Sequence, residues 1–268
     1  MRLFNVLYRF YQNRDLVFQF TRREIEMRHK GSKLGHFWAL ITPLMMLGLY
    51  LFVFGLIFGG RFGVLKDENF FDFALALFLG ISLFQIVADT ISSSPSLITN
   101  QPNFVKKVVF PLEILSLSRV ISSVYFASLS ILITVILAPF SHGGLTIRVL
   151  ELPLIILPLV LISLGISWTL SAVGVFYRDL DHTTPFIATA VMYGSAILYS
   201  LNRVPPVVAR ILQLNQLVTI INEARRVTLW GLPLEFNHLG YTYMISVLIF
   251  ALGLALFTRV RPYFAEVI

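Results

Sequence analysis

The chain of 268 residues contains no cysteine. This absence excludes disulfide bonds, zinc sites built from thiolates and cysteine nucleophiles. Charged residues are also scarce, at 13% of the chain, whereas hydrophobic residues make up 57% and the mean hydropathy is +0.80. A water-soluble domain carries about a quarter charged residues and under half apolar ones. The chain therefore has more apolar surface than one soluble core could bury, which indicates an integral membrane protein.

The chain also lacks the motifs of ATP hydrolysis and of zinc proteases. It has no GxxxxGK[ST] phosphate-binding loop, because the stretch GSKLGHF at residues 31–37 has the wrong spacing and precedes an apolar run instead of following a strand. It has no HExxH motif, and its five histidines are scattered without the spacing of a helical metal site. We therefore expect no catalytic residue, no cofactor and no metal ion on this chain.

The formal net charge is +7, which by itself is compatible with nucleic-acid binding. The basic residues, however, cluster at the ends of apolar runs, where an inner-membrane protein meets anionic headgroups and the cytoplasm. We expect membrane lipids as partners and no nucleic acid. Too many basic residues precede the first apolar run for the short head of a signal peptide; they are Arg2, Arg9, Arg14, Arg22, Arg23, Arg28, Lys30 and Lys33.

The apolar runs predict an all-α fold with six transmembrane helices. A helix needs about 20 apolar residues to cross the hydrocarbon core of a bilayer. Runs of that size cover residues 37–60, 71–91, 113–140, 152–177, 183–201 and 241–260. The transmembrane domain is thus expected to extend over residues 37–268.

Two further segments flank or interrupt these spans. Residues 1–36 begin with apolar residues at helical spacing interleaved with arginines, which predicts an amphipathic helix on the cytoplasmic membrane surface. Residues from about 202 to 240 are apolar but are broken by Pro205, Pro206, Pro233 and several charges. We expect this segment to form one or two short helices that re-enter the membrane from the periplasmic side, buried against other helices.

The distribution of lysine and arginine predicts the orientation. With the N-terminus inside, thirteen of these residues lie in cytoplasmic segments and seven in external ones, so both termini should be cytoplasmic. Four of the external seven are discordant because they share one segment: Arg203, Arg210, Arg225 and Arg226. Away from the first and last two positions of each predicted span, the ionisable residues are Asp89 and Arg119, near the cytoplasmic ends of their helices. A structural ion pair or snorkelling explains them more economically than proton coupling.

The segment RREIEMRHKGSKLGHFWALITP at residues 22–43 carries a resemblance to a known family. An Arg-Glu pair, a later basic pair, a Leu-Gly, a Trp and a Pro occur in the order found in polysaccharide-export permeases of the ATP-binding-cassette exporter class. Three later segments resemble the same family: FVKKVVFPLEILSLSR at 104–119, VFYRDLDH at 175–182 and ILYSLNRVP at 197–205. One departure is Asn215-Gln216, where the family often has Asn-Pro. The geometry of the re-entrant segment could therefore differ from that of the family.

The resemblance implies partners and a cargo. The working exporter would contain two copies of this chain as a homodimer and two copies of a separate ATPase subunit, which would bind ATP and magnesium. The cargo would be a lipid-linked polysaccharide such as an O-antigen, a capsule or a teichoic acid, exported across the bacterial inner membrane. Two other functions stay open. One is export of a small lipophilic molecule, against which the 22–43 segment argues, and the other is a channel or secondary transporter.

Two places are candidates for docking on the ATPase. In the loop at 94–107, Pro95 follows three serines and would start a short rigid helix, and Pro102 would stop it; such a helix could fit a cleft in a partner. The coupling residues expected there are Pro95, Ser96, Leu97, Asn100 and Gln101. The resemblance adds Leu34 and Gly35, before the first span. The alternative is that 94–107 is an ordinary connecting loop.

The first span carries the candidate substrate channel. Tyr50, Phe54 and Phe58 recur at every fourth residue, which places them on one helix face, and Trp38 begins the same span. Aromatic faces can stack on the apolar C–H faces of sugars and would guide a glycan without holding it. The alternative is that these rings only pack against other helices or face lipid.

Overall fold

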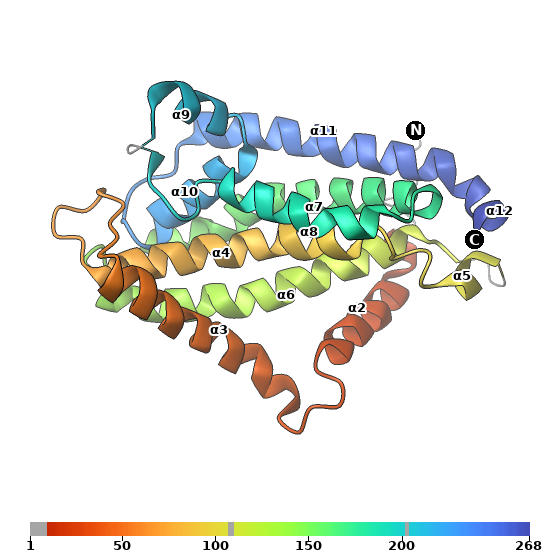
Figure 1. The fold of residues 1–268 in the computed structure, drawn as a ribbon, viewed down its shortest axis with the longest axis horizontal. Helices are drawn as coiled ribbons and strands as arrows, with labels where there is room; N and C mark the ends of the chain where they lie inside the picture. The colour runs from red at the N-terminus through yellow and green to blue at the C-terminus, as the bar shows by residue number, and fades with distance from the viewer. Residues whose placement is uncertain (1–9, 107–109, 202–203) are drawn as a thin grey trace.

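The computed structural model describes residues 10–106, 110–201 and 204–268 (Figure 1). Across these residues the regular structure is helical. Its longer helices are α2 (Arg14–Arg28), α3 (Trp38–Tyr50), α4 (Phe70–Ser93), α6 (Glu113–Leu137), α7 (Leu152–Phe176), α8 (Leu180–Tyr193), α10 (Gln216–Thr228) and α11 (Phe236–Val260). Short helices lie between or after them: α5 (Pro102–Lys106), α9 (Pro206–Leu212) and α12 (Phe264–Val267).

Five helical segments are long and apolar enough to cross a membrane: Gly35–Ile57, Phe70–Ser93, Glu113–Phe140, Ile147–Phe176 and Phe236–Val267. They coincide with five of the six predicted spans and confirm an all-helical integral membrane protein. The run at 183–201 differs. Helix α8 has 14 residues, about 21 Å at 1.5 Å per residue, and ends before Gly194, so it is shorter than a membrane core of about 30 Å.

Helix α4 is the centre of the bundle (Figure 1). In the 18-residue stretch that defines α4 as a membrane span, 78% of the residues are buried, against 11% in the corresponding stretch of the span that contains α3. Helices α6, α7, α8 and α10 all contact α4, whereas α3 slants away from the bundle at one end. The outer face of α3 is therefore left to lipid or to another chain.

Helices α7 and α11 approach each other closely through two glycines. A Cβ atom on Gly253 would lie 2.2 Å from the carbonyl oxygen of Gly165, and one on Gly165 would lie 2.4 Å from that of Ile249. Small residues allow two membrane helices to bring their backbones together, which gains van der Waals contact where lipid offers no hydrophobic driving force.

Helix α2 is fastened to the bundle by both apolar and charged contacts. Phe20 packs against Phe110, with ring centroids 5.0 Å apart. A glutamate oxygen of Glu24 lies 2.5 Å from an Arg119 guanidinium nitrogen, and Arg28 lies 2.9 Å from Asp89. Asp89 and Arg119 thus both have ion-pair partners on α2, as expected for a structural role. The first nine residues, where the predicted amphipathic helix begins, lie outside the described part of the chain.

The segment after α8 forms short helices, as predicted, and Asn215 fixes where α10 begins. Its side-chain oxygen accepts the backbone N–H of Leu217 at 3.0 Å, which is an N-cap contact. Its amide nitrogen donates to the Gly194 carbonyl oxygen at 2.9 Å. Gln216 occupies the first helical position, where proline is favoured but not required. The Asn-Gln departure therefore leaves the start of α10 intact.

Candidate functional site

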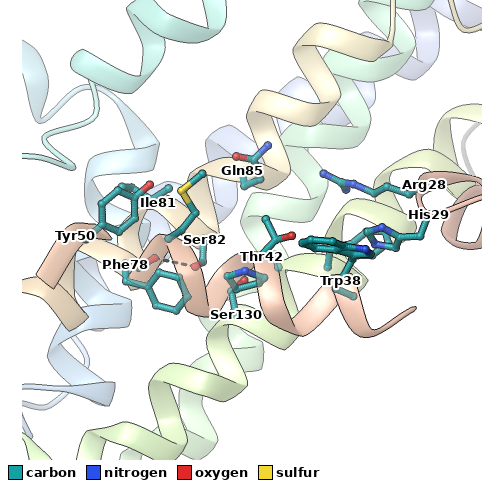
Figure 2. Close-up of a pocket in the computed structure, with 15 residues that line it drawn as sticks. Arg28, His29, Trp38, Thr42, Tyr50, Phe78, Ile81, Ser82, Gln85 and Ser130 are labelled. Atoms are coloured by element: carbon teal, nitrogen blue, oxygen red, sulfur yellow. Dashed lines mark hydrogen bonds between the residues drawn. The ribbon is translucent and has the colours of Figure 1, made fainter. Parts of the chain in front are cut away.

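A cavity of about 300 Å³ lies between the end of α2 and helices α3, α4 and α6 (Figure 2). One wall comes from the 22–43 segment that carries the family resemblance, through Arg28, His29, Trp38, Thr42 and Pro43. In Figure 2, Arg28 and His29 lie at one end of the cavity and Tyr50 at the other. The segment singled out in the sequence therefore shapes a ligand-sized space.

The basic end of the cavity is held by a charged network. Arg28 donates to one oxygen of Asp89 at 2.9 Å, and the Gln85 amide donates to the other at 2.6 Å. The Arg28 guanidinium also lies over the Phe126 ring, 4.4 Å from its centroid. Its side chain nevertheless remains 41% exposed. A cation fixed on one side and open on the other suits an anionic or strongly polar ligand group.

His29 is the neutral polar group beside this cation. Burial, together with the charge of Arg28 and the nearby His36, lowers the pKa of His29 below its ordinary 6.5, so the ring is uncharged at neutral pH. Its Nε2 atom is enclosed and has no hydrogen-bond partner among the described residues. His29 therefore offers the cavity a hydrogen-bonding nitrogen without adding charge.

The opposite wall is apolar and continues into an aromatic stripe. The ring centroids of Tyr50 and Phe54 are 6.2 Å apart, and those of Phe54 and Phe58 are 6.0 Å apart. The stripe follows a π-helical turn, η2 (Leu51–Ile57), in which Phe58 N–H donates to the Val53 carbonyl. Phe54 and Phe58 line a second cavity, of about 270 Å³, together with Arg61 and Tyr199.

The four residues predicted for the channel are thus divided between two neighbouring cavities. Trp38 and Tyr50 line the first cavity, and Phe54 and Phe58 line the second. The spacing at every fourth residue does produce one continuous stripe of rings. That it guides a substrate stays a prediction.

The loop predicted to couple to an ATPase has a buried base and an exposed tip. Pro95 is buried against Gly174, where an added Cβ atom would lie 2.2 Å from the Pro95 carbonyl oxygen. Ile98 is fully buried, whereas Asn100 is exposed, as are Pro102, Asn103 and Lys106. Of the other predicted coupling residues, Ser96, Leu97 and Gln101 are partly buried. A partner can reach the tip, while Pro95 can contribute only by holding the loop in place.

The second coupling candidate lies elsewhere on the surface. Leu34 is 49% exposed, and Gly35 has a φ of +50°, a left-handed conformation that glycine adopts without strain. In Figure 1 the turn between α2 and α3 is separate from α5. The structure does not bring the two predicted docking places together within one chain.

Sequence reasoning missed Arg225, which is fully buried on α10. Its guanidinium donates to the carbonyl oxygens of Ala76 and Ile197, each at 2.8 Å, and lies 4.3 Å from the Phe62 ring centroid. Burial lowers the pKa of Arg225 to about 9 and the negative charge of Glu68 opposes the drop, so the group stays charged at neutral pH. Arg225 joins α10 to α4 and to the turn after α8.

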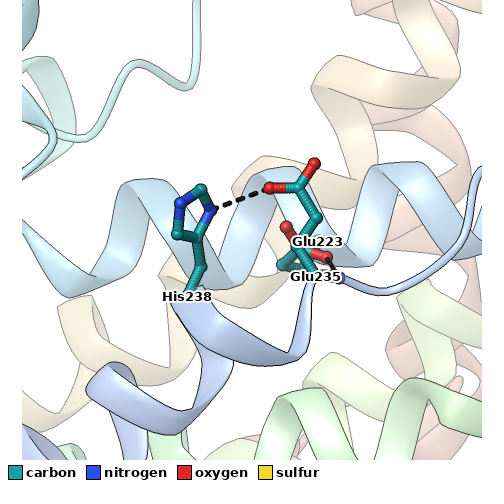
Figure 3. A group of neighbouring side chains, drawn as sticks. All are labelled: Glu223, Glu235 and His238. Atoms are coloured by element: carbon teal, nitrogen blue, oxygen red, sulfur yellow. Dashed lines mark hydrogen bonds and ion pairs between the residues drawn. The ribbon is translucent and has the colours of Figure 1, made fainter.

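A second missed group lies at a cavity of about 510 Å³, beside α10 and the start of α11. Ligand atoms of Glu223, Glu235 and His238 lie within 4.8 Å of one another (Figure 3). Arg226 approaches Glu235 at 2.8 Å, and Glu223 accepts the backbone N–H of Glu235 at 3.0 Å. Both carboxylates thus already have hydrogen-bond or ion-pair partners, and this arrangement does not argue for a metal ion.

The chain is similar in sequence to several known export proteins. The chain is 25% identical to the O-antigen export system permease protein RfbA of Klebsiella pneumoniae, over 95% of both chains. It is 24% identical to the protein of that name in Myxococcus xanthus, over 96% of both. It is also 24% identical to the polysialic acid transport protein KpsM of Escherichia coli, over 88% of this chain and 89% of that one.

The family model of the ABC-2 type transporters matches residues 15–230. The match begins in α2 and ends just after α10. It includes the residues that line the cavity at Tyr50 and the cavity at Phe54 and Phe58. The kinship with transporter permeases that residues 22–43 indicated is therefore confirmed: this chain belongs to the ABC-2 type transporter family.

Proposed function

We propose that this chain is the membrane subunit of an ATP-driven exporter that moves a lipid-linked polysaccharide across the bacterial inner membrane. The observation that carries the proposal is the amphipathic cavity of the 22–43 segment, which leads into the stripe of Tyr50, Phe54 and Phe58. A lipid-linked glycan has an anionic linkage, sugars with apolar C–H faces and an apolar tail. Arg28, the rings and the outer face of α3 offer a matching contact for each. The relatives, named for O-antigen export and polysialic acid transport, support the same function.

The proposed exporter contains two copies of this chain and two ATPase subunits. ATP and magnesium would bind the ATPase, because this sequence has no phosphate-binding loop. The exposed tip of the 94–106 loop is the proposed docking point, with Leu34 and Gly35 as the second candidate. The sparsely buried α3 supports a homodimer, since a second copy could cover the face that the bundle leaves open.

The direct test measures surface polysaccharide in a strain that lacks this chain. Restoring the chain together with its ATPase should restore the polymer at the cell surface, and restoring the chain alone should leave it inside. Export without the ATPase would instead favour a channel or secondary transporter. The ion pairs of Asp89 and Arg119 with α2 already argue against proton coupling, because both groups are held by structural partners.

We propose six membrane crossings, with the short α8 as the fifth, and both termini in the cytoplasm. The cysteine-free chain allows a clean test with single cysteines. A membrane-impermeant maleimide should label Ile147→Cys in intact cells, because this residue is 84% exposed between α6 and α7. Val267→Cys, near the C-terminus, should be labelled only after permeabilisation. Labelling of Val267→Cys in intact cells would exclude the proposed topology.

Removing the aromatic faces of the stripe should impair export more than folding. We expect the double variant Phe54→Leu with Phe58→Leu to lower export about 3- to 10-fold at unchanged membrane levels, since leucine keeps the apolar bulk and loses the π face. Phe52→Leu is the matched control: Phe52 is 56% exposed on the same π-helical turn and lines neither cavity. Normal export by the double leucine variant would mean that the stripe only packs.

A further inference from the structure

The cavity of about 510 Å³ lies at the end of the bundle that carries α9 and α10, opposite α5 and α12 (Figure 1). Four separate parts of the chain line it: the loop before α4, the turn after α8, helix α10 with its flanking residues, and the stretch that leads into the first turns of α11. Its volume falls within the range of about 300–1,000 Å³ found for small-molecule sites. In the proposed topology this end is external, so the cavity is placed where an exported polymer would leave.

Aromatic rings form part of the lining. Trp230, Tyr199 and Tyr241 all contribute, and Tyr241 is 49% exposed. Two of the rings are held in place: Tyr199 donates its hydroxyl to the Tyr193 carbonyl at 2.6 Å, and Trp230 lies 6.2 Å from the Phe62 ring centroid. Rigid, partly exposed rings with a polar edge are suited to a ligand that has both C–H faces and hydroxyl groups.

Planar hydrogen-bonding groups form another part of the lining. Asn222, Glu223, Glu235 and His238 each present paired or adjacent polar atoms to the cavity. Glu235 is fixed at 2.8 Å from Arg226, which also donates to the Pro233 carbonyl at 3.1 Å. The side chains are therefore positioned before any ligand arrives, which lowers the entropic cost of binding. Planar amide and carboxylate groups can each contact two neighbouring hydroxyls of a sugar.

The charge of the lining discriminates between classes of sugar. Among the described lining residues, two carboxylates face one guanidinium, and that guanidinium is already paired with Glu235. A polyanionic chain would meet like charge here, and like charges disfavour a complex strongly when they are partly desolvated. An uncharged sugar meets no such penalty.

The cavity also adjoins the smaller cavity at the aromatic stripe. Tyr199 and Ser200 line both this cavity and the smaller one formed by Phe54 and Phe58. A polymer that slides along the stripe would therefore reach this cavity next. That shared lining favours the exported chain itself as the occupant.

We propose that this cavity is an exit subsite that binds uncharged sugar residues of the exported polysaccharide, with Tyr241 and Trp230 as stacking surfaces and Asn222, Glu235 and His238 as hydrogen-bonding groups. The proposal rests on the proposed export function and adds that the cargo is a neutral glycan. It differs in this respect from what the name of the polysialic acid transport relative describes, since polysialic acid is a polyanion.

The test uses the purified full-length chain in lipid nanodiscs with a single cysteine in the cavity. Gln213→Cys places an accessible thiol on the lining, and Val207→Cys places one on α9 outside it. The rate of maleimide labelling is measured with mannohexaose and with a sialic acid hexamer at equal concentration. Mannohexaose should slow labelling of Gln213→Cys and leave Val207→Cys unaffected, while the sialic acid hexamer should protect neither.

Ring variants in the Gln213→Cys background test the stacking surface. Tyr241→Leu should weaken protection by mannohexaose about 2- to 10-fold, whereas Tyr241→Phe should keep it, because phenylalanine retains the ring. Tyr263→Leu is the control: this tyrosine is 55% exposed in η6 (Arg261–Tyr263), at the opposite end of the bundle. Protection of Gln213→Cys that Tyr241→Leu leaves unchanged would remove Tyr241 from the site.

The neutral and anionic probes decide the proposal without any ring variant. Absence of protection by mannohexaose, or equal protection by the sialic acid hexamer, would overturn it. If the ATPase still drives polysaccharide export in cells, that result overturns the exit subsite alone. Failure of ATPase-dependent export would instead remove the function on which the subsite rests.

Discussion

Replacing the exposed tip of the loop after α4 should abolish export and leave the permease folded. The variant carries Asn100→Ala, Asn103→Ala and Lys106→Ala, three exposed residues around α5. A docking surface concentrates its binding energy in a few side chains, and loss of about 2 kcal/mol weakens an interface roughly 30-fold. We expect export to fall more than tenfold, with less ATPase recovered when the permease is purified. Both are measured in cells that express normal levels of the variant.

The buried base of the loop determines how this experiment is designed. Replacing the whole loop would also remove Pro95 and Ile98, which are buried in the bundle, so a loss of export would report misfolding. The three-residue variant leaves the base intact. Arg210→Ala, on exposed α9 at the opposite end of the bundle, is the control and should export normally. Normal export by the tip variant would refute this docking point and make Leu34 and Gly35 the better candidate.

Hydropathy predicted five of the membrane helices well because each is both long and continuous. It overestimated the run at 183–201 for a physical reason. After Gly194 the chain turns, and Ala196 has a φ of +48°, yet Ala196 and Ile197 are buried in the protein core. Apolar side chains are required both on a helix that faces lipid and on irregular backbone buried in protein. Composition alone cannot separate these two environments.

The stripe of Tyr50, Phe54 and Phe58 was predictable because its members are close in sequence and a helix places every fourth residue on one face. The 22–43 segment was found by resemblance, and the structure adds that it forms one wall of a cavity. The ion pairs of Glu24 with Arg119 and of Arg28 with Asp89 join residues 95 and 61 positions apart. No local pattern specifies such partners, so the sequence favoured a structural ion pair or snorkelling for Asp89 and Arg119 without identifying their partners.

Arg225 illustrates the same limit most clearly. It counted as one of four discordant arginines in a segment expected on the external side. The structure shows instead that it is buried and that Arg226 binds Glu235 and lies near Glu223. Arg225 thus lies in the protein interior and Arg226 is ion-paired, so neither is a free charge in an exposed loop. Lysine and arginine bias topology when they lie in exposed loops, so these two arginines are weaker exceptions to the predicted orientation than their number suggests.

Replacing Arg225 should destabilise the protein more than any surface change. Its guanidinium bridges the carbonyl oxygens of Ala76, in α4, and Ile197, in the turn after α8. The Glu68 carboxylate, which accepts the backbone N–H groups of Phe62 and Gly63, would lose its nearby countercharge. Arg225→Met leaves two buried acceptors and one charge uncompensated. We expect a loss of at least ~3 kcal/mol, measured by thermal unfolding of the purified chain in detergent.

Two further variants separate geometry from charge. Arg225→Lys keeps the positive charge, but an ammonium group lacks the planar fork that reaches two carbonyls in different elements, so it should rescue only part of the loss. Gly80→Ala leaves Arg225 in place but adds a Cβ atom 2.6 Å from its Nη2, so it should also destabilise. Arg210→Met, on exposed α9, is the control. Full stability of Arg225→Lys would mean that charge alone matters and that the bridge between α4, α10 and the turn after α8 contributes nothing.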